Sequence, residues 1–228
     1  MRSMSKTFRD CLLLSLAAGF LYVGTSAQED PWAGQRVVNI LQEPRHRTMH
    51  RDGDIVLLDV QINPGDMTLP HTHDSAILYT FISNGEGPLN GRVSGNTDYV
   101  KENYTHQVSN EGPGLFRIIA LANYGPGQAV VATGRPAGLT GEPQLENEWF
   151  RSYRVELAPG AQTALHSHGN PSVVVQVSEG LTHVTRADGI TAELDAMGDW
   201  AWRDANSSYQ VKNMGAVPVS IVINEARR

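Results

Sequence analysis

The sequence predicts an all-β protein that contains two copies of one module, each an antiparallel sandwich or barrel of the jelly-roll kind. Short runs rich in β-branched residues, such as 118–121, 172–177 and 217–223, alternate with Gly, Pro, Asn and Asp. Such runs, bounded by turn residues, are typical of strands in antiparallel sheets. The sequence shows no sustained helical period. With 228 residues, the chain is long enough for one large domain or two small ones.

The first 27 residues have the pattern of a secretory signal peptide. Arg2, Lys6 and Arg9 precede an apolar run of 13 residues, 11–23, and the small residues at 25–27 then offer a cleavage site. The apolar run is shorter than the roughly 20 residues that span a bilayer, which makes a retained membrane anchor the weaker alternative. We therefore expect an exported protein, periplasmic or secreted, with no membrane attachment after cleavage.

Removal of this segment makes the chain more acidic. It takes away three of the 18 basic residues and one of the 24 acidic residues, and changes the formal net charge from −6 to −8. A chain with this charge is not expected to bind nucleic acid. Cys11 is the one cysteine of the sequence and leaves with the segment, so neither disulfides nor thiolate ligands are expected.

Internal repetition divides the rest of the chain into two domains. Five residues recur 95 positions further along the chain: Pro64, Gly65, His71, His73 and Gly85. Three more recur 103 positions further along: Gly95, Asn103 and Asn110. An insertion of eight residues between the two blocks explains the different displacements. We predict one domain over 28–134 and a second, equivalent domain over 135–228.

The spacing of these residues resembles the two motifs of the cupin family. The first motif matches at Gly65, His71, His73 and Gly85, and the second at Gly95, His106 and Asn110. The resemblance implies a double-stranded β-helix for each copy, and therefore two tandem jelly-roll cupin barrels, a bicupin. It also implies that His71, His73 and His106 bind one metal ion in the first barrel.

Strand geometry is consistent with these three ligands. Side chains at positions i and i+2 of a strand lie on the same face, so His71 and His73 point in one direction, and His106 approaches from a later strand. Three imidazoles leave open positions for water or substrate, as in catalytic metal sites. The expected cofactor is a divalent transition metal: Fe²⁺ if the protein is an oxygenase, with Zn²⁺, Cu²⁺, Mn²⁺ and Ni²⁺ as alternatives.

The glutamate ligand of the family is missing from the first copy. Its position falls on Leu78, or on Ile77 at the shorter spacing, and neither side chain can bind a metal. Asp74 is an alternative carboxylate, although it should face away from the ligands as the neighbour of His73 on a regular strand. A bound ion would keep its full +2 charge and would favour an anionic or bidentate oxygen ligand.

The second copy carries a reduced version of the site. His166 and His168 keep the histidine pair, Val173 stands at the glutamate position, and Tyr209 stands where the third histidine is expected. Two imidazoles and a phenol make a weaker metal site. Two interpretations stay open: a weak second metal site, or a barrel that is kept for packing or for formation of a homodimer.

Two residues of the first copy are candidates for catalysis. Tyr79 flanks the expected ligands and could act as an acid or base, although aromatic packing explains it equally well. Arg117 could hold a substrate carboxylate beside the metal, unless strand alternation turns it outward. His46 and His50 lie in a segment rich in arginine and are interpreted as solvated residues.

These observations favour an exported metal-dependent oxidoreductase that acts on a small chelating or anionic substrate. Three-histidine cupins of this kind resemble iron-dependent dioxygenases that open diketones and hydroxylated aromatic acids or oxidise thiols. Two alternatives stay open: a non-catalytic cupin that binds a small molecule such as a sugar acid, and a metal-dependent isomerase or lyase.

Overall fold

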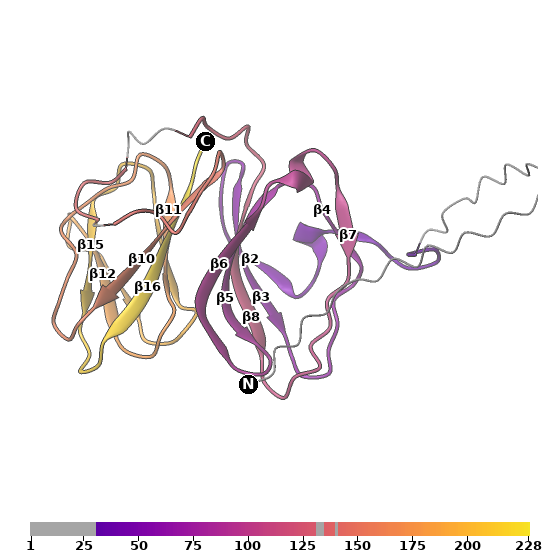
Figure 1. Ribbon diagram of the computed structural model, residues 1–228, viewed down its shortest axis with the longest axis horizontal. Helices are drawn as coiled ribbons and strands as arrows, with labels where there is room; N and C mark the ends of the chain where they lie inside the picture. Colours follow the sequence, from indigo (N-terminus) through magenta and orange to yellow (C-terminus); the bar gives the residue numbers. More distant parts are fainter. Residues whose placement is uncertain (1–30, 131–134, 140) are drawn as a thin grey trace, which may run out of the picture. The chain divides into compact units, whose positions relative to one another are not determined.

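The computed structural model confirms the all-β fold class (Figure 1). It describes residues 31–130, 135–139 and 141–228. The predicted signal peptide, 1–27, lies outside the described residues. Residues 34–228 form one compact unit. Within the part that the structure describes, we find no helix with the length and apolar character needed to cross a bilayer.

The first half of this unit, residues 38–123, consists of two sheets. Its strands are β1 (Val38–Asn39), β2 (His46–Asp52), β3 (Ile55–Ile62), β4 (His71–His73), β5 (Ala76–Asn84), β6 (Pro88–Asn96), β7 (Tyr104–His106) and β8 (Phe116–Asn123). Two single-turn 3-10 helices lie between strands: η1 (Ile40–Gln42) between β1 and β2, and η2 (Asp98–Val100) between β6 and β7. The larger sheet has the order β2-β3-β8-β5-β6, and the smaller has the order β1-β4-β7.

The second half, residues 145–226, also consists of a five-stranded and a three-stranded sheet. Its strands are β9 (Leu145–Glu146), β10 (Phe150–Leu157), β11 (Ser172–Gln176), β12 (Thr182–Arg186), β13 (Thr191–Leu194), β14 (Trp200–Arg203), β15 (Tyr209–Asn213) and β16 (Val219–Ala226). The sheet orders are β14-β11-β16-β10-β9 and β13-β12-β15. The same pair of sheet sizes in both halves agrees with the repetition in the sequence.

Both faces of the first five-stranded sheet are buried. On β3, Val56 and Leu58 point into the first half, toward the cluster that includes Ile118. The alternate residues Ile55 and Leu57 pack on the other face, in a cluster shared with the second half. A strand buried on both faces has apolar residues at almost every position, which explains the nearly continuous apolar sequence of β3 and β8.

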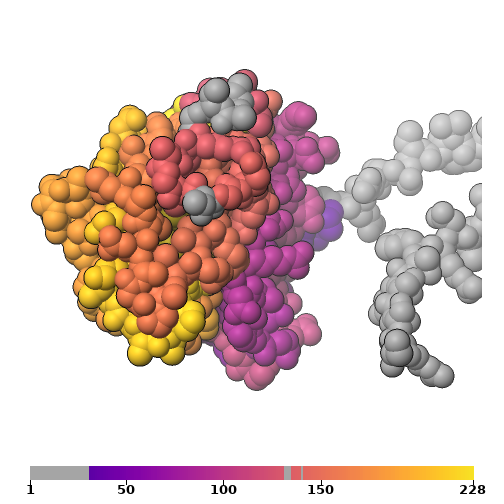
Figure 2. All heavy atoms as spheres, turned by 60° about the vertical axis from the view of Figure 1, so that its left-hand side comes forward, coloured from indigo at the N-terminus to yellow at the C-terminus, as the bar shows by residue number. Residues whose placement is uncertain are grey.

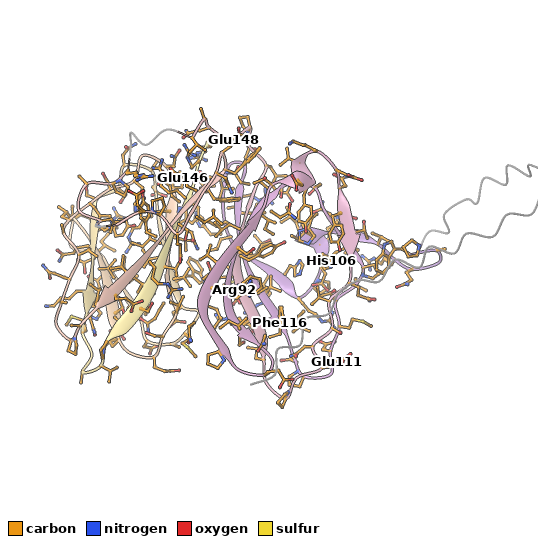
Figure 3. The ribbon with its side chains drawn as sticks, viewed as in Figure 1. Arg92, His106, Glu111, Phe116, Glu146 and Glu148 are labelled. Atoms are coloured by element: carbon orange, nitrogen blue, oxygen red, sulfur yellow. The ribbon has the colours of Figure 1, made fainter. Side chains whose placement is uncertain are left out.

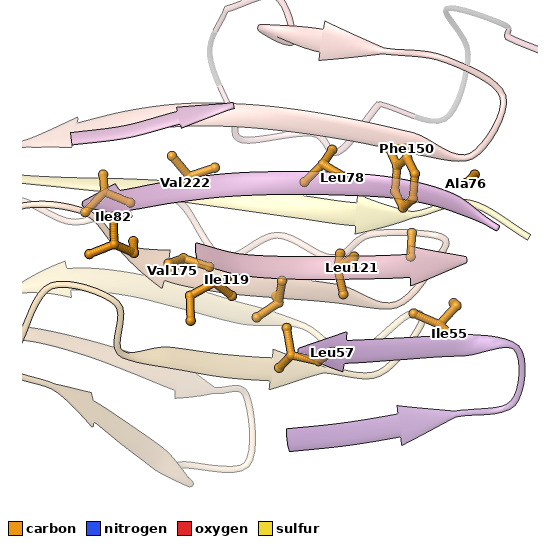
Figure 4. Packing of buried hydrophobic residues seen from close by; sticks show 13 residues of the cluster. Ile55, Leu57, Ala76, Leu78, Ile82, Ile119, Leu121, Phe150, Val175 and Val222 are labelled. Atoms are coloured by element: carbon orange, nitrogen blue, oxygen red, sulfur yellow. The ribbon is translucent and has the colours of Figure 1, made fainter. Parts of the chain in front are cut away.

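The shared cluster joins the two five-stranded sheets face to face. Leu78 and Leu121 from the first half meet Phe150, Val175 and Val222 from the second (Figure 4). The atoms of the two halves are in direct contact in Figure 2. This shared core is the reason that residues 34–228 form one unit, although the sequence is duplicated.

Buried hydrogen bonds supplement this core. Asn224 Nδ2 on β16 donates to Thr80 Oγ1 on β5 over 2.7 Å. Arg117 on β8 donates to the carbonyl oxygens of Met197 and Gly198, at 3.0 and 3.1 Å. Polar groups that are paired in this way can be buried at low cost and fix one relative placement of the two sheets.

The repeated asparagine of the second motif has a structural role in each half. Asn110 Nδ2 donates to Ile62 O and Gly114 O, both at 2.8 Å, and Asn110 Oδ1 accepts from Gly112 N at 3.1 Å. Asn213 makes the equivalent three bonds in the second half. The side chain ties the loop before the last strand to the end of an earlier strand. This structural role explains, without a metal ion, why the asparagine recurs at the same position in both halves.

We predict that Asn110→Ala destabilises the protein by about 3 kcal/mol, because three buried backbone groups lose their partner. The change in free energy of unfolding can be measured by denaturant titration. Asn84→Ala is the matched control: Asn84 Oδ1 also accepts from two backbone amides, but at an exposed turn. This control should cost less than about 1 kcal/mol. Equal effects of the two substitutions would contradict the structural role.

Candidate metal centre

Three histidines of the first half come together where β4 pairs with β7. In the antiparallel register His71 lies directly opposite His106, so the two side chains project from the same face of the pair. His73 lies two residues along β4 and projects from that face too. Each ring offers one nitrogen, and these three nitrogens lie within 4.8 Å of one another. Figure 3 shows His106 in the interior of the first half.

A hydrogen bond to the backbone determines which ring nitrogen of His71 can bind a metal at the centre of this group. His71 Nδ1 lies 2.9 Å from Leu69 O, which can only accept, so Nδ1 carries the proton and Nε2 bears the lone pair. Within the described residues this buried Nε2 has no hydrogen-bond partner. The Nε2 atoms of His73 and His106 lie 3.0 Å apart. A metal ion would satisfy the lone pair of His71 Nε2, and a hydrogen bond from the opposite ring nitrogen, as His71 Nδ1 forms, is typical of a metal-bound histidine.

Burial keeps the three imidazoles neutral. Desolvation, followed by the nearby rings of His106 and His71, lowers the pKa of His73 to about 3. Desolvation and the ring of His71 lower the pKa of His106 to about 4. Desolvation also lowers the pKa of His71. Because imidazole binds metals in its neutral form, these ligands need not lose a proton near neutral pH.

The three residues therefore fit a divalent transition metal ion. Imidazole nitrogen is a suitable donor for zinc, copper, iron and nickel, so the donor set does not select one of them. Three protein ligands on one side of an ion leave positions open on the other side, as in catalytic sites.

The structure also shows why this site has no carboxylate. Ile77 projects into the cavity beside the histidines, whereas Leu78 lies on the opposite face of β5, in the core shared by the two halves. Asp74 Oδ2 accepts a hydrogen bond from Asn39 Nδ2 over 2.9 Å. Among the residues that the structure describes, no Asp or Glu joins the group of His71, His73 and His106. The ion would be held by neutral ligands alone.

The histidines open into a cavity of about 280 Å³ inside the first half. Ten of its sixteen lining residues are aliphatic or phenylalanine, among them Leu58, Phe81 and Ile118. The other six are four histidines and two tyrosines, so none of the described residues that line the cavity carries a charged side chain. A ligand in this space would meet apolar walls, and the metal ion would supply the positive charge.

Tyr79 lines this cavity, as expected of a residue that contacts substrate. Its hydroxyl shares a hydrogen bond with that of Tyr99, which η2 places on the same wall. Burial, followed by the charge and the hydrogen bond of Tyr99, raises the pKa of Tyr79 well above its usual range. Tyr79 therefore stays protonated, and this favours a hydrogen-bond donor over a base.

The interpretation of His46 as a solvated residue is wrong. His46 is the first residue of β2, is 6% exposed, and lines the same cavity. Its ring stands edge-on to that of His71, with 4.5 Å between the centroids. The arginines around it on β2 face outward because side chains alternate along a strand. The sequence signal for this placement is weak, because His46 alone is buried among residues 46–52 and a register irregularity between Thr48 and His50 breaks the alternation.

The proposed role of Arg117 in substrate binding is not supported by its position. On β8 the side chain faces the second half, and it does not line the cavity. Its guanidinium donates to Asp59 Oδ1 at 3.1 Å and to Oδ2 at 3.2 Å, in addition to the two carbonyl groups of the second half. Arg117 thus joins the two halves, whereas Phe116, Ile118 and Ala120 of β8 face the cavity.

The second half brings its three predicted residues together in a different arrangement. His166 pairs with Tyr209 as His71 pairs with His106, and their ring centroids are 4.5 Å apart. The centroid of His168 lies 5.6 Å from that of His166 and 6.0 Å from that of Tyr209. Tyr209 is fully buried, and its hydroxyl lies 3.4 Å from Ser172 Oγ. The phenol thus reaches deeper into the barrel than an imidazole would.

Glu225 is a buried acid of this second site that the sequence analysis missed. Its Oε2 lies 3.2 Å from His168 Nδ1 and 3.6 Å from Arg151 Nη1. Asn170 Nδ2 donates to its other oxygen over 2.8 Å. Comparison of the repeats could not reveal Glu225, because the residue 103 positions earlier is Ala122. The acid belongs to a network of buried ion pairs, which gives His168 a structural partner.

Comparison with known proteins bears on the fold. No protein-family model and no curated protein matches the chain. Among solved structures, AerE from Microcystis aeruginosa is similar at 12% identity and a TM-score of 0.57, over 82% of this chain and 99% of that one. A Cupin 2 conserved barrel domain protein from Leptotrichia buccalis is similar at 10% identity and a TM-score of 0.52, over 79% of this chain and 88% of that one. The chain therefore has the all-β, double-stranded β-helix fold of cupin proteins, with a possible three-histidine metal site in its first half.

Proposed function

We propose that this chain is an exported bicupin and a metal-dependent oxidoreductase of the dioxygenase type, which acts on a small chelating substrate in the cavity of its first half. One observation carries the proposal: His71, His73 and His106 converge on an apolar cavity whose described lining residues include no carboxylate. The pattern of the first 27 residues supports export. The convergence of the three histidines on the cavity supports the reaction type.

Charge narrows the class of substrate. Three neutral imidazoles leave a divalent ion with its full charge of +2, in a cavity that no acidic side chain lines. In such a low-dielectric space the ion attracts an anionic ligand strongly. The apolar walls favour a substrate whose remaining atoms are uncharged. We infer a compact chelator with a bidentate, singly anionic oxygen head and an apolar body, such as the enolate of a diketone.

The side chains around the site have separate tasks in this proposal. An Fe²⁺ ion held by the three histidines would supply the redox chemistry that insertion of O₂ into an organic substrate requires. The apolar walls orient the substrate and exclude water. Tyr79, which stays protonated, can donate a hydrogen bond to an anionic oxygen of the substrate.

The same features weaken the two alternatives. A site for a sugar acid needs several polar side chains to pair with hydroxyl groups, whereas ten of the sixteen lining residues here are aliphatic or phenylalanine. An isomerase or lyase needs a base in the cavity. The raised pKa of Tyr79 makes it a poor base, and burial lowers the pKa of His46 to about 3, which makes its imidazole a weak one. The dioxygenase type fits the cavity better because its chemistry requires few polar groups from the protein.

The first prediction concerns the number of metal ions. We expect one ion per chain in the purified protein after incubation with Fe²⁺ or Zn²⁺, as measured by elemental analysis. His73→Ala should reduce this to less than about 0.1, because two imidazoles bind divalent ions weakly. His168→Ala, at the equivalent position of the second half, should keep one ion. Two ions in the wild-type protein, or loss of the ion in His168→Ala alone, would contradict the assignment.

A second prediction tests the missing carboxylate. Ile77→Glu places an acid at the cavity wall and lowers the net charge of the loaded site from +2 to +1. We expect tighter Zn²⁺ binding and a dissociation constant for acetohydroxamate, a monoanionic chelator, that rises about tenfold or more. Ile77→Gln is the matched neutral control. It should change the affinity for acetohydroxamate less than about threefold, because it removes only one apolar contact. Equal effects of Glu and Gln would show that charge does not determine ligand choice.

The reaction itself is tested by oxygen uptake. The Fe²⁺-loaded protein should consume O₂ when a diketone such as pentane-2,4-dione is added, and His73→Ala should not. Phenolic acids and thiols are the other compounds of the panel, and they should react more slowly, because a phenolic acid carries an additional charge and a thiol binds through sulfur in place of an oxygen pair. No O₂ consumption with any of the three classes, while iron is bound, would refute the dioxygenase type.

A further inference from the structure

His46 is a fourth imidazole in the metal cavity, and the three-histidine site does not account for it. It lies opposite Val60 in the pairing of β2 with β3, and Val60 is itself a residue of the cavity wall. Residues in directly opposite positions share a face, so both point inward. The wall around His46 is otherwise formed by Ile40, Leu58 and Ile62. An imidazole in such an apolar wall is expensive to bury unless it has a polar partner.

One ring nitrogen of His46 has that partner in the backbone. Nδ1 lies 3.2 Å from Ile40 O, which can only accept, so Nδ1 carries the proton. Nε2 then carries the lone pair and is the acceptor nitrogen of the ring. The side chain is thereby oriented as an acceptor on the cavity wall.

The backbone that orients His46 is itself held in place. Ile40 is the first residue of η1, and Asn39 caps this helix by accepting a hydrogen bond from Leu41 N over 2.9 Å. Asn39 in turn donates to Asp74 Oδ2, one residue after the metal-binding pair of β4. The chain of contacts from Asp74 through Asn39 to Ile40 sets the position of His46 relative to β4. This gives Asp74 a structural role in place of the metal-binding role considered above.

His46 is also placed outside the group that would hold the ion. The ligand nitrogens of His71, His73 and His106 lie within 4.8 Å of one another, and His46 does not belong to that group. Its ring contacts His71 edge-on, on the wall of the cavity. A fourth imidazole at this place faces the molecule that occupies the open positions of the ion.

We propose that His46 contacts the substrate, and that its Nε2 accepts a hydrogen bond from a donor on the chelating head. This inference rests on the proposed function and specifies it further. Among monoanionic chelators with the same oxygen pair, diketone enolates included, the site would then prefer one that also carries an N–H or O–H next to this pair. His46 would be a specificity-determining residue, distinct from the three metal ligands.

Two hydroxamates provide the test. Acetohydroxamate and N-methylacetohydroxamate bind metals through the same two oxygens with the same charge, but only the first keeps an N–H. We expect the Co²⁺-loaded protein, followed by its visible absorption, to bind acetohydroxamate about fivefold to tenfold more tightly, which corresponds to one hydrogen bond. His46→Phe, which keeps a ring of similar shape, should reduce this ratio to about one. His46→Gln, which keeps an acceptor, should retain part of it.

Controls separate the possible failures. His183→Phe, at a partly exposed histidine paired with Glu193, should leave both affinities unchanged. A ratio in His46→Phe that equals the wild-type ratio, with Co²⁺ still bound, would overturn this inference and leave the proposed function intact. Loss of Co²⁺ from His46→Phe would also overturn it, because His46 would then be a metal ligand. A wild-type protein that binds no Co²⁺ would refute the proposed function itself.

Discussion

The pairing of β4 with β7 is the constraint on which the site depends. Two strands of three residues place His71 opposite His106 and His73 two residues away, so all three imidazoles leave the same face. On the other face Thr72 Oγ1 and Thr105 Oγ1 form a hydrogen bond of 2.8 Å. Because side chains alternate, a shift of one residue in this register would point the threonines inward and the imidazoles outward. The parallel pairing of β1 with β4 supports this short strand from its other edge.

The second half contributes to the site indirectly, through the sheet that forms its back wall. Residues of β3, β5 and β8 face the cavity on one side and the second half on the other, so the position of the wall depends on the shared core. Leu78 and Ile77, which are adjacent in the sequence, belong to these two different environments. In the second half itself, the buried phenol of Tyr209 stands in place of the third imidazole, and Glu225 lies 3.2 Å from His168 Nδ1 and 3.6 Å from Arg151 Nη1. The two halves thus have different roles. This difference gives a physical reason why the described residues of a duplicated chain contain only one three-histidine group.

Much of this arrangement could be predicted from the sequence, because motif spacing in strands translates directly into geometry. The positions of His71, His73 and His106, the absence of a glutamate at Ile77, and the duplication all follow from residue spacing. The placement of Arg117 could not be predicted, because a strand buried on both faces is apolar throughout and its pattern does not identify the inner face. The placement of His46 could not be predicted for another reason: the residue precedes the motif, lies among arginines, and begins a strand that is mostly exposed.

The central claim is that three imidazoles of one half hold a single ion and no side-chain carboxylate does. X-ray absorption at the metal edge of the Zn²⁺-loaded protein tests this most directly, because imidazole rings give a characteristic multiple-scattering pattern. We expect three imidazoles per ion, with light oxygen scatterers from water in the remaining positions. A spectrum with fewer than two imidazoles, or with a carboxylate as the dominant ligand, would contradict the convergence of β4 and β7 on one metal ion.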